Sequence, residues 1–155
     1  MPMEKSSNKL VDLSVAFAVE ILNLVKYLKE QRETIISNQI GRAGTSIWAN
    51  IHEAQYAHGK SDFIAKLQIA LKEANETSYW LLLLGKTNIL SSAEYDRLET
   101  LCREIRITLI ASINTTKQNL KYPIAAGPLS SGISDKKSHI FEFLFLYFSF
   151  RHDKL

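Results

Sequence analysis

The sequence predicts an all-α protein, an antiparallel up-down-up-down bundle of four helices with an irregular C-terminal tail. Apolar residues recur at steps of three and four along most of the chain, a pattern typical of helices that bury one face. No proline occurs between Pro2 and Pro123, and proline costs about 3 kcal/mol inside a helix. Short polar links join the periodic segments, so residues 8–121 are expected to form one bundle domain.

The first two helices are expected over residues 8–31 and 33–57. The apolar positions of the first form the seam of a bundle helix: Leu10, Leu13, Phe17, Ile21, Leu24 and Leu28. The second contains Gly41 and Gly44 on nearly one face. Glycine costs a helix about 1 kcal/mol relative to alanine. The pair therefore suggests either the close approach of a neighbouring helix or a local irregularity.

The third helix is expected over residues 62–86, after a break at residues 58–61. Gly59 can take the left-handed conformation that ends a helix, and Ser61 or Asp62 can cap the next one. Within this helix, Asp62 and Lys66 are spaced for an ion pair between residues i and i+4.

The fourth helix is expected to end near Asn119. Ser91 and Glu94 form the sequence signature of a capping box at its start. Glu99 and Arg103 are spaced for a second ion pair of the i and i+4 type.

The end of the third helix is apolar on every side, from Tyr79 to Leu84. A bundle helix buries only one stripe, so this turn needs a second partner surface. Self-association provides one, and a thick core under a covering loop is the alternative. The residues predicted to form an oligomer interface are Trp48, Tyr79, Trp80, Leu82 and Leu83.

The composition changes after Lys121. Residues 122–132 are rich in proline, glycine and serine, as in a linker. The run Ile140–Phe150 holds five of the seven phenylalanines. It is too short to span a bilayer as a helix, which takes about 20 residues. Residues 122–155 are therefore expected to be a linker and an aromatic-rich tail, either poorly ordered or docked on the bundle.

Composition and charge are those of an ordinary globular protein. The 155 residues are 46% hydrophobic and 23% charged, with a formal net charge of +3. Cys102 is the single cysteine, which excludes an internal disulfide and fits a reducing compartment. The N-terminus is polar and mixed in charge, unlike a secretory signal. These features predict a cytoplasmic protein.

No motif with catalytic or metal-binding spacing is present in the sequence. His52-Glu53 resembles the start of a zinc-protease helix, but Tyr56 stands where the second histidine is needed. The Glu-x-x-His pairs of a di-iron bundle are also missing. Cys102 falls in the apolar stripe of the fourth helix, which predicts a thiol buried in the core. We therefore expect no enzymatic activity, no metal and no cofactor.

Basic residues are spread over the second to fourth helices. Each alone is most simply a solvated charge, but a symmetric oligomer repeats it into rings or stripes that can neutralise phosphates. The residues predicted to bind nucleic acid in this way are Arg42, Lys60, Lys66, Lys72, Arg103 and Arg106.

Two long motifs resemble a known family. The run QIGRAGTSIWANIHEA, residues 39–54, resembles the Q-x-x-R-[SA]-[GA]-T-S-I-x-A-N-I-x-E-[AG] signature of four-helix-bundle proteins encoded in intervening sequences of bacterial 23S ribosomal RNA genes. The similarity continues through Ser61–Leu81 and covers residues 10–119. The aromatic tail has no counterpart in it.

The resemblance implies an antiparallel bundle that assembles into a homopentamer without known enzymatic activity. Accessory proteins of diversity-generating retroelements look similar, and they bind a reverse transcriptase and nucleic acid through a basic surface. By position, Arg42, Lys60, Lys66 and Lys72 are the candidates for such a surface here. The expected function is a non-catalytic oligomeric scaffold that binds RNA or DNA. The alternative is a protein–protein interaction module with no nucleic-acid role.

Overall fold

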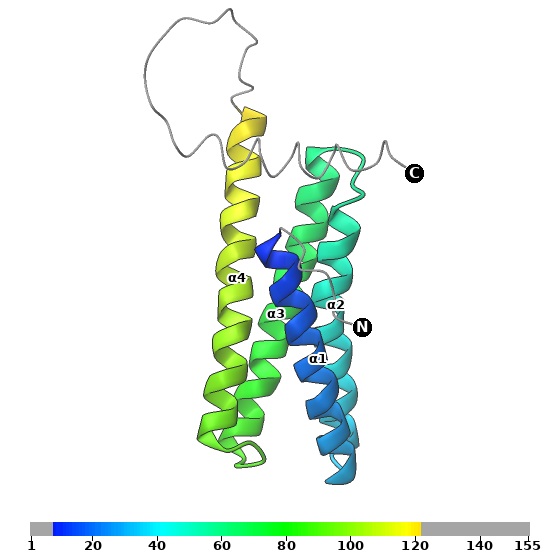
Figure 1. Cartoon of the computed structure of the whole chain (residues 1–155), viewed down its shortest axis with the longest axis vertical. Helices are drawn as coiled ribbons and strands as arrows, with labels where there is room; N and C mark the ends of the chain where they lie inside the picture. Colours follow the sequence, from blue (N-terminus) through cyan, green and yellow to red (C-terminus); the bar gives the residue numbers. More distant parts are fainter. Residues whose placement is uncertain (1–7, 122–155) are drawn as a thin grey trace, which may run out of the picture.

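The computed structural model describes residues 8–121, which form four long helices (Figure 1). They are α1 (Lys9–Glu30), α2 (Thr34–Ala54), α3 (Lys60–Lys86) and α4 (Ser92–Lys121). Consecutive helices pack extensively on one another, whereas α1 and α4 meet over a shorter stretch. The predicted all-α fold, an up-down-up-down bundle, is confirmed. The predicted tail, residues 122–155, lies outside the described residues.

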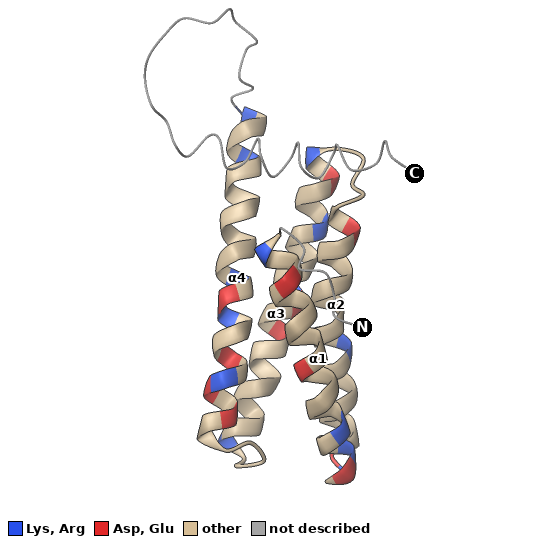
Figure 2. Cartoon of the chain, viewed as in Figure 1, with Lys and Arg blue, Asp and Glu red and all other residues tan. Residues whose placement is uncertain are grey.

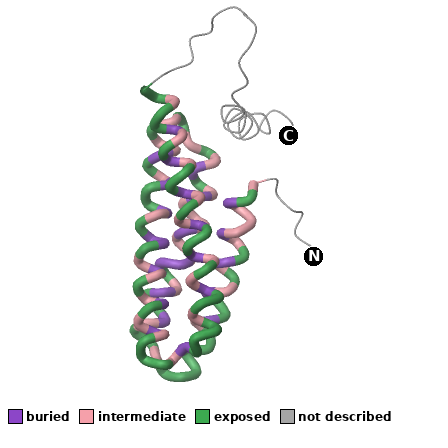
Figure 3. Tube along the Cα trace, turned by 90° about the vertical axis from the view of Figure 1, so that its left-hand side faces the viewer, coloured by how far each residue is buried: buried purple, intermediate pink, exposed green. Residues whose placement is uncertain are grey.

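One apolar stripe from each helix forms the core (Figure 3). The largest side chains that are completely buried include Phe17 and Ile21 from α1, Ile40 and Ile47 from α2, Leu67 and Leu81 from α3, and Ile105 and Leu109 from α4. Burying each such side chain contributes about 1.5–3 kcal/mol, which makes these stripes the main source of stability. Among the described helices, none is long and apolar enough to cross a membrane.

The two helical glycines of α2 pack against side chains of α1. A Cβ atom built on Gly44 would stand 2.8 Å from both γ carbons of Ile21, and one on Gly41 would stand 3.0 Å from a methyl group of Val25. The explanation by close approach of a neighbouring helix is therefore confirmed.

The capping box that opens α4 forms as predicted. The Ser91 amide donates to Glu94 Oε2 at 3.0 Å, and the Glu94 amide donates to Ser91 Oγ at 3.3 Å. The hydrogen bonds from Ser91 lower the pKa of Glu94. The helix therefore begins where the sequence places it.

The prediction of a left-handed Gly59 is wrong. Its φ is 174°, which is extended backbone, and neither Ser61 nor Asp62 makes a side-chain cap to the amides of α3. Asp62 instead accepts a hydrogen bond from the His58 amide at 3.1 Å. The left-handed residues among those described are Arg32, with φ 63°, and Asn88, with φ 57°, at the other two turns. Asparagine tolerates this conformation better than most residues, and a left-handed residue just after a helix end lets the chain reverse.

Candidate functional site

A cluster of charged side chains joins α2 to α3. The Arg42 guanidinium is 3.3 Å from the Glu73 carboxylate and also forms an ion pair with Glu76. The indole of Trp80 donates to the same Glu76 oxygen at 3.5 Å. The hydrogen bond from Arg42 lowers the pKa of Glu76, and the same contact raises the pKa of Arg42. The charge of Arg42 is therefore balanced within the bundle.

Two more of the predicted nucleic-acid residues are also ion-paired. Lys66 lies 2.6 Å from Glu53 of α2, which raises the pKa of Lys66. Arg106 pairs with Glu99, and Glu99 also accepts a hydrogen bond from Ser78 of α3 at 2.9 Å. The i and i+4 pairs predicted for Lys66 with Asp62 and for Glu99 with Arg103 are wrong, because other partners lie closer in the fold.

The other three predicted cations make no ion pair with any described residue. Lys60 begins α3 and is half-buried, while Lys72 and Arg103 are exposed on α3 and α4. Basic and acidic residues are interleaved on the helices (Figure 2). The exception is α4 beyond Glu104, where the charged residues are all basic: Arg106, Lys117 and Lys121.

Four of the five predicted interface residues come together on the last turns of α3. Tyr79 is 53% exposed and Leu82 is 42% exposed, whereas Trp80 and Leu83 are half-buried. The rings of Tyr79 and Trp80 meet edge to face with centroids 5.0 Å apart. Large apolar side chains that remain open to water and adjoin one another mark an interaction surface.

Ile35 extends this surface onto α2. It lies seven residues before Arg42, and Leu83 lies seven residues after Glu76, the partner of Arg42. Seven residues make two helical turns, so in antiparallel helices Ile35 and Leu83 lie side by side. Ile35 is 77% exposed, the highest value among the large apolar residues described. The apolar spacing of the sequence did not single out Ile35, because it falls outside the buried face of α2.

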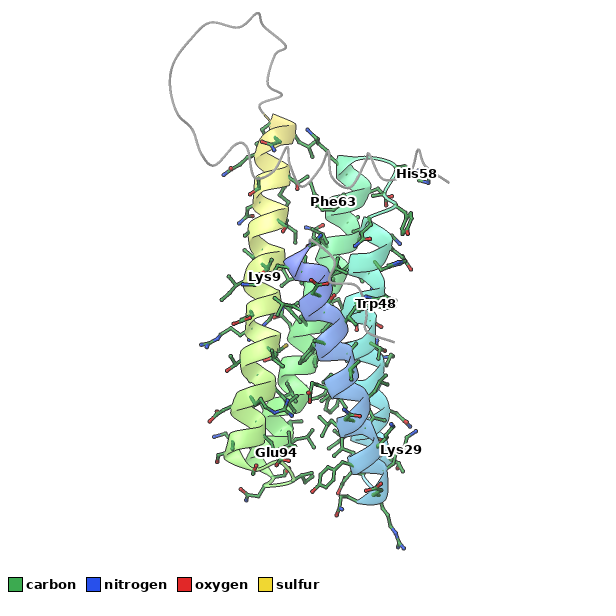
Figure 4. The ribbon with its side chains drawn as sticks, viewed as in Figure 1. Lys9, Lys29, Trp48, His58, Phe63 and Glu94 are labelled. Atoms are coloured by element: carbon green, nitrogen blue, oxygen red, sulfur yellow. The ribbon has the colours of Figure 1, made fainter. Side chains whose placement is uncertain are left out.

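Trp48, the fifth predicted interface residue, stands apart from this surface. It lies on α2 (Figure 4), one turn after Gly44, on the side that faces α1. Its ring contacts His52 with centroids 5.1 Å apart, and His52 contacts Tyr56 at 5.3 Å. The buried Trp48 Nε1 has no hydrogen-bond partner among the described residues.

We name the surface formed by Ile35, Tyr79, Trp80, Leu82 and Leu83 the α3 patch.

No constellation suited to metal-assisted or nucleophilic chemistry occurs in the described part of the chain. No group of three or more histidine, cysteine, aspartate or glutamate side chains gathers there in a way that would hold a metal ion. Cys102 is buried and donates to the Ala74 carbonyl at 3.3 Å. Burial raises the pKa of its thiol to about 12, so the nucleophilic thiolate is scarce.

Fold and surface together define a small antiparallel four-helix-bundle protein whose described surface features are an apolar patch and interhelical ion pairs. The model of the 23S rRNA-intervening sequence protein family matches residues 6–111, and the chain belongs to this family. A crystal structure of a protein of unknown function from the S23 ribosomal protein family of Bacteroides thetaiotaomicron is 50% identical, with a TM-score of 0.66. The match covers 67% of this chain and 97% of that one. No curated protein matches the sequence.

Proposed function

We propose that this protein is a non-catalytic scaffold that self-associates through the α3 patch. The observation that carries the proposal is the group of exposed apolar side chains on α3, with Ile35 beside them on α2. Full burial of one such side chain contributes about 1.5–3 kcal/mol. Several of them buried together offset much of the cost of association, which is about 4–15 kcal/mol.

The family resemblance supports five copies as the size of the assembly. Native mass by light scattering tests this, because each chain contributes 17.6 kDa. Tyr79→Glu places a charge in the centre of the patch and is expected to reduce the mass to that of a monomer. Ile107→Glu is the matched control, since Ile107 is 61% exposed on α4, outside the patch. A monomeric wild-type chain at tens of micromolar would refute self-association.

The unpaired cations favour nucleic-acid binding as a second function of the assembly. Lys60, Lys72 and Arg103 make no ion pair with a described residue, and the last four turns of α4 carry no acidic residue. A cation without a protein partner can neutralise a phosphate without first giving up a carboxylate. The resemblance to retroelement accessory proteins extends the proposal to a reverse transcriptase as a protein partner.

Two arginines of α4 provide a matched test of RNA binding. Arg103 is exposed and unpaired, whereas Arg106 is held by Glu99. Arg103→Gln and Arg106→Gln remove the same charge from the same helix. We expect Arg103→Gln to weaken binding of labelled single-stranded RNA more strongly and to reduce the salt slope by about 0.7 for each phosphate that is no longer neutralised. No binding by the wild-type assembly at low salt would leave the protein-interaction alternative.

A further inference from the structure

We propose that Glu76 is a positioning residue for the α3 patch, because its carboxylate holds the indole of Trp80 in place and is itself held by Arg42. The inference rests on the proposed self-association and identifies what prepares the patch for that contact. It also gives Arg42 a role in organising the α3 patch, different from the nucleic-acid contact that its charge predicts.

One oxygen atom of Glu76 connects the ion pair to the patch. The Arg42 guanidinium of α2 and the Trp80 indole both donate to Glu76 Oε1, the indole at 3.5 Å. Glu76 and Trp80 are four residues apart, so they are neighbours on the surface of α3 and meet without distortion of the helix. The hydrogen bonds from Arg42 and Trp80 lower the pKa of Glu76. The group therefore stays ionised, which is the form that accepts hydrogen bonds most strongly.

Arg42 is a fixed support for Glu76. Its guanidinium also lies 3.3 Å from the carboxylate of Glu73, three residues before Glu76 on α3. Glu73 is 9% exposed, and a carboxylate at such a site depends on a cation. A planar guanidinium holds two carboxylates at once, whereas a lysine ammonium acts as a point charge. Arg42 therefore fixes Glu76 from the neighbouring helix, and Glu76 fixes Trp80.

The orientation of Trp80 matters for the rest of the patch. Trp80 is half-buried, and its ring meets that of Tyr79 edge to face with centroids 5.0 Å apart. A side chain that is free to change rotamer must be ordered when a partner docks, which weakens association. With Trp80 held in advance, the two rings present one fixed surface. The patch is thus preorganised, and its affinity is higher without any added contact.

The same ion pair aligns the two helices that share the patch. Ile35 lies two turns before Arg42 on α2, and Leu83 lies two turns after Glu76 on α3. Because the helices are antiparallel, the contact of Arg42 with Glu76 brings Ile35 and Leu83 to the same level. The ion pair therefore also sets how the α2 part of the patch joins its α3 part.

Two substitutions of Glu76 separate the hydrogen-bond acceptor from the charge. Glu76→Ala removes both, whereas Glu76→Gln removes the charge and keeps a carbonyl oxygen that accepts from the indole. We expect Glu76→Ala to raise the dissociation constant of the assembly by about two- to ten-fold, the effect of ordering one large side chain. Glu76→Gln is expected to raise it clearly less. Light scattering over a dilution series measures both constants, and equal effects would overturn the proposal because the lost charge would then explain them.

The ion pair of Glu53 with Lys66 provides a matched control. It joins the same two helices at 2.6 Å and contains no patch residue. Lys66 lies ten residues before Glu76, about 15 Å away along α3. Glu53→Ala is expected to leave the dissociation constant unchanged. A weakening as large as that of Glu76→Ala would assign the effect to a looser contact between α2 and α3, and would also overturn the proposal.

Fluorescence of Trp80 tests the positioning without relying on assembly. The chain has two tryptophans, and Trp48→Phe leaves Trp80 as the single one. The Trp48 Nε1 has no hydrogen-bond partner among the described residues, so phenylalanine leaves none of their acceptors unpaired. In this background and in dilute protein, acrylamide is expected to quench Trp80 more strongly in Glu76→Ala than in Glu76→Gln or the parent.

The quenching result and the native mass separate two kinds of failure. Equal quenching in the parent and both Glu76 variants would show that Glu76 does not hold Trp80, and would overturn the proposal while self-association stands. A wild-type chain that is monomeric at tens of micromolar would instead show that the proposed function fails. The quenching series would then still decide whether Glu76 positions Trp80.

Discussion

Replacing Gly44 by alanine is expected to destabilise the bundle, although alanine is the better helix former. The added Cβ would stand 2.8 Å from both γ carbons of Ile21 and 3.1 Å from its Cβ. Ile21 is completely buried, and its β-branched side chain has one strongly preferred rotamer in a helix. The clash is therefore relieved only if α1 and α2 move apart.

Two opposing effects set the magnitude. Alanine gains about 1 kcal/mol in helix propensity over glycine. Forcing an extra methyl group into a packed core costs about 1–3 kcal/mol, and the short distances to a rigid side chain place Gly44→Ala at the upper end. The expected net loss of stability is about 1–2 kcal/mol. Gly41→Ala is the matched control, because its Cβ would meet a single methyl group of the half-buried Val25 at 3.0 Å, and its net change is expected to stay within about 0.5 kcal/mol.

Urea unfolding followed by circular dichroism measures these changes. All variants are compared at one protein concentration, since any association shifts the apparent stability. Ile21→Val removes one methyl group and is expected to cost about 0.5–1.5 kcal/mol alone, but clearly less when Gly44→Ala is present. If Gly44→Ala stabilised the protein by about 1 kcal/mol, as at an exposed helical site, the argument from close approach would be refuted.

Three further predictions concern the cap, the carboxylates and the thiol. Ser91→Ala is expected to cost about 1 kcal/mol in urea unfolding, because it removes the oxygen that caps α4; a cost below about 0.3 kcal/mol would argue against the capping box. The folded-state pKa values of Glu76 and Glu94 are lowered, so their stabilisation is present above the unfolded carboxyl value of about 4.3 and disappears as pH falls through the folded values. The melting temperature of the wild type should therefore fall between about pH 5 and pH 3, and that of Glu76→Gln should fall less. Equal falls in the two proteins would assign the acid sensitivity to other groups. Native Cys102, with a pKa of about 12, should resist alkylation by iodoacetamide at pH 8 and react fully in urea. Mass spectrometry distinguishes the alkylated from the unmodified chain. Rapid alkylation of the native protein would show that the core around Cys102 opens readily.

The helices were predictable because their signals are local. Apolar spacing and the Ser91–Glu94 pair each depend on neighbours within a few residues, and both predictions are confirmed. The turns were less predictable. The chain reverses with Arg32 and Asn88 left-handed, while Gly59, the residue best suited to that conformation, is extended. A glycine permits a positive φ but does not require one.

The partners of charged side chains were not predictable from spacing alone. Lys66 has Asp62 one turn away on its own helix, yet it pairs with Glu53 on α2. The choice depends on the register between helices, which is set by buried Gly44 and by core side chains that lie far apart in the sequence. The α3 patch was partly visible as a run of apolar residues. Ile35 joins it only because α2 runs antiparallel to α3 in a register that the Arg42–Glu76 pair marks.

The ion pairs also limit which cations are available to a ligand. Glu73 is 9% exposed, and a carboxylate that loses its partner at such a site is costly. A phosphate that recruits Arg42 must therefore leave both Glu73 and Glu76 without their main cation. Arg103 carries no such cost, because no described carboxylate depends on it. Any nucleic-acid affinity of this protein should therefore depend on its unpaired cations, and a strong decrease in Arg106→Gln with none in Arg103→Gln would contradict that reasoning.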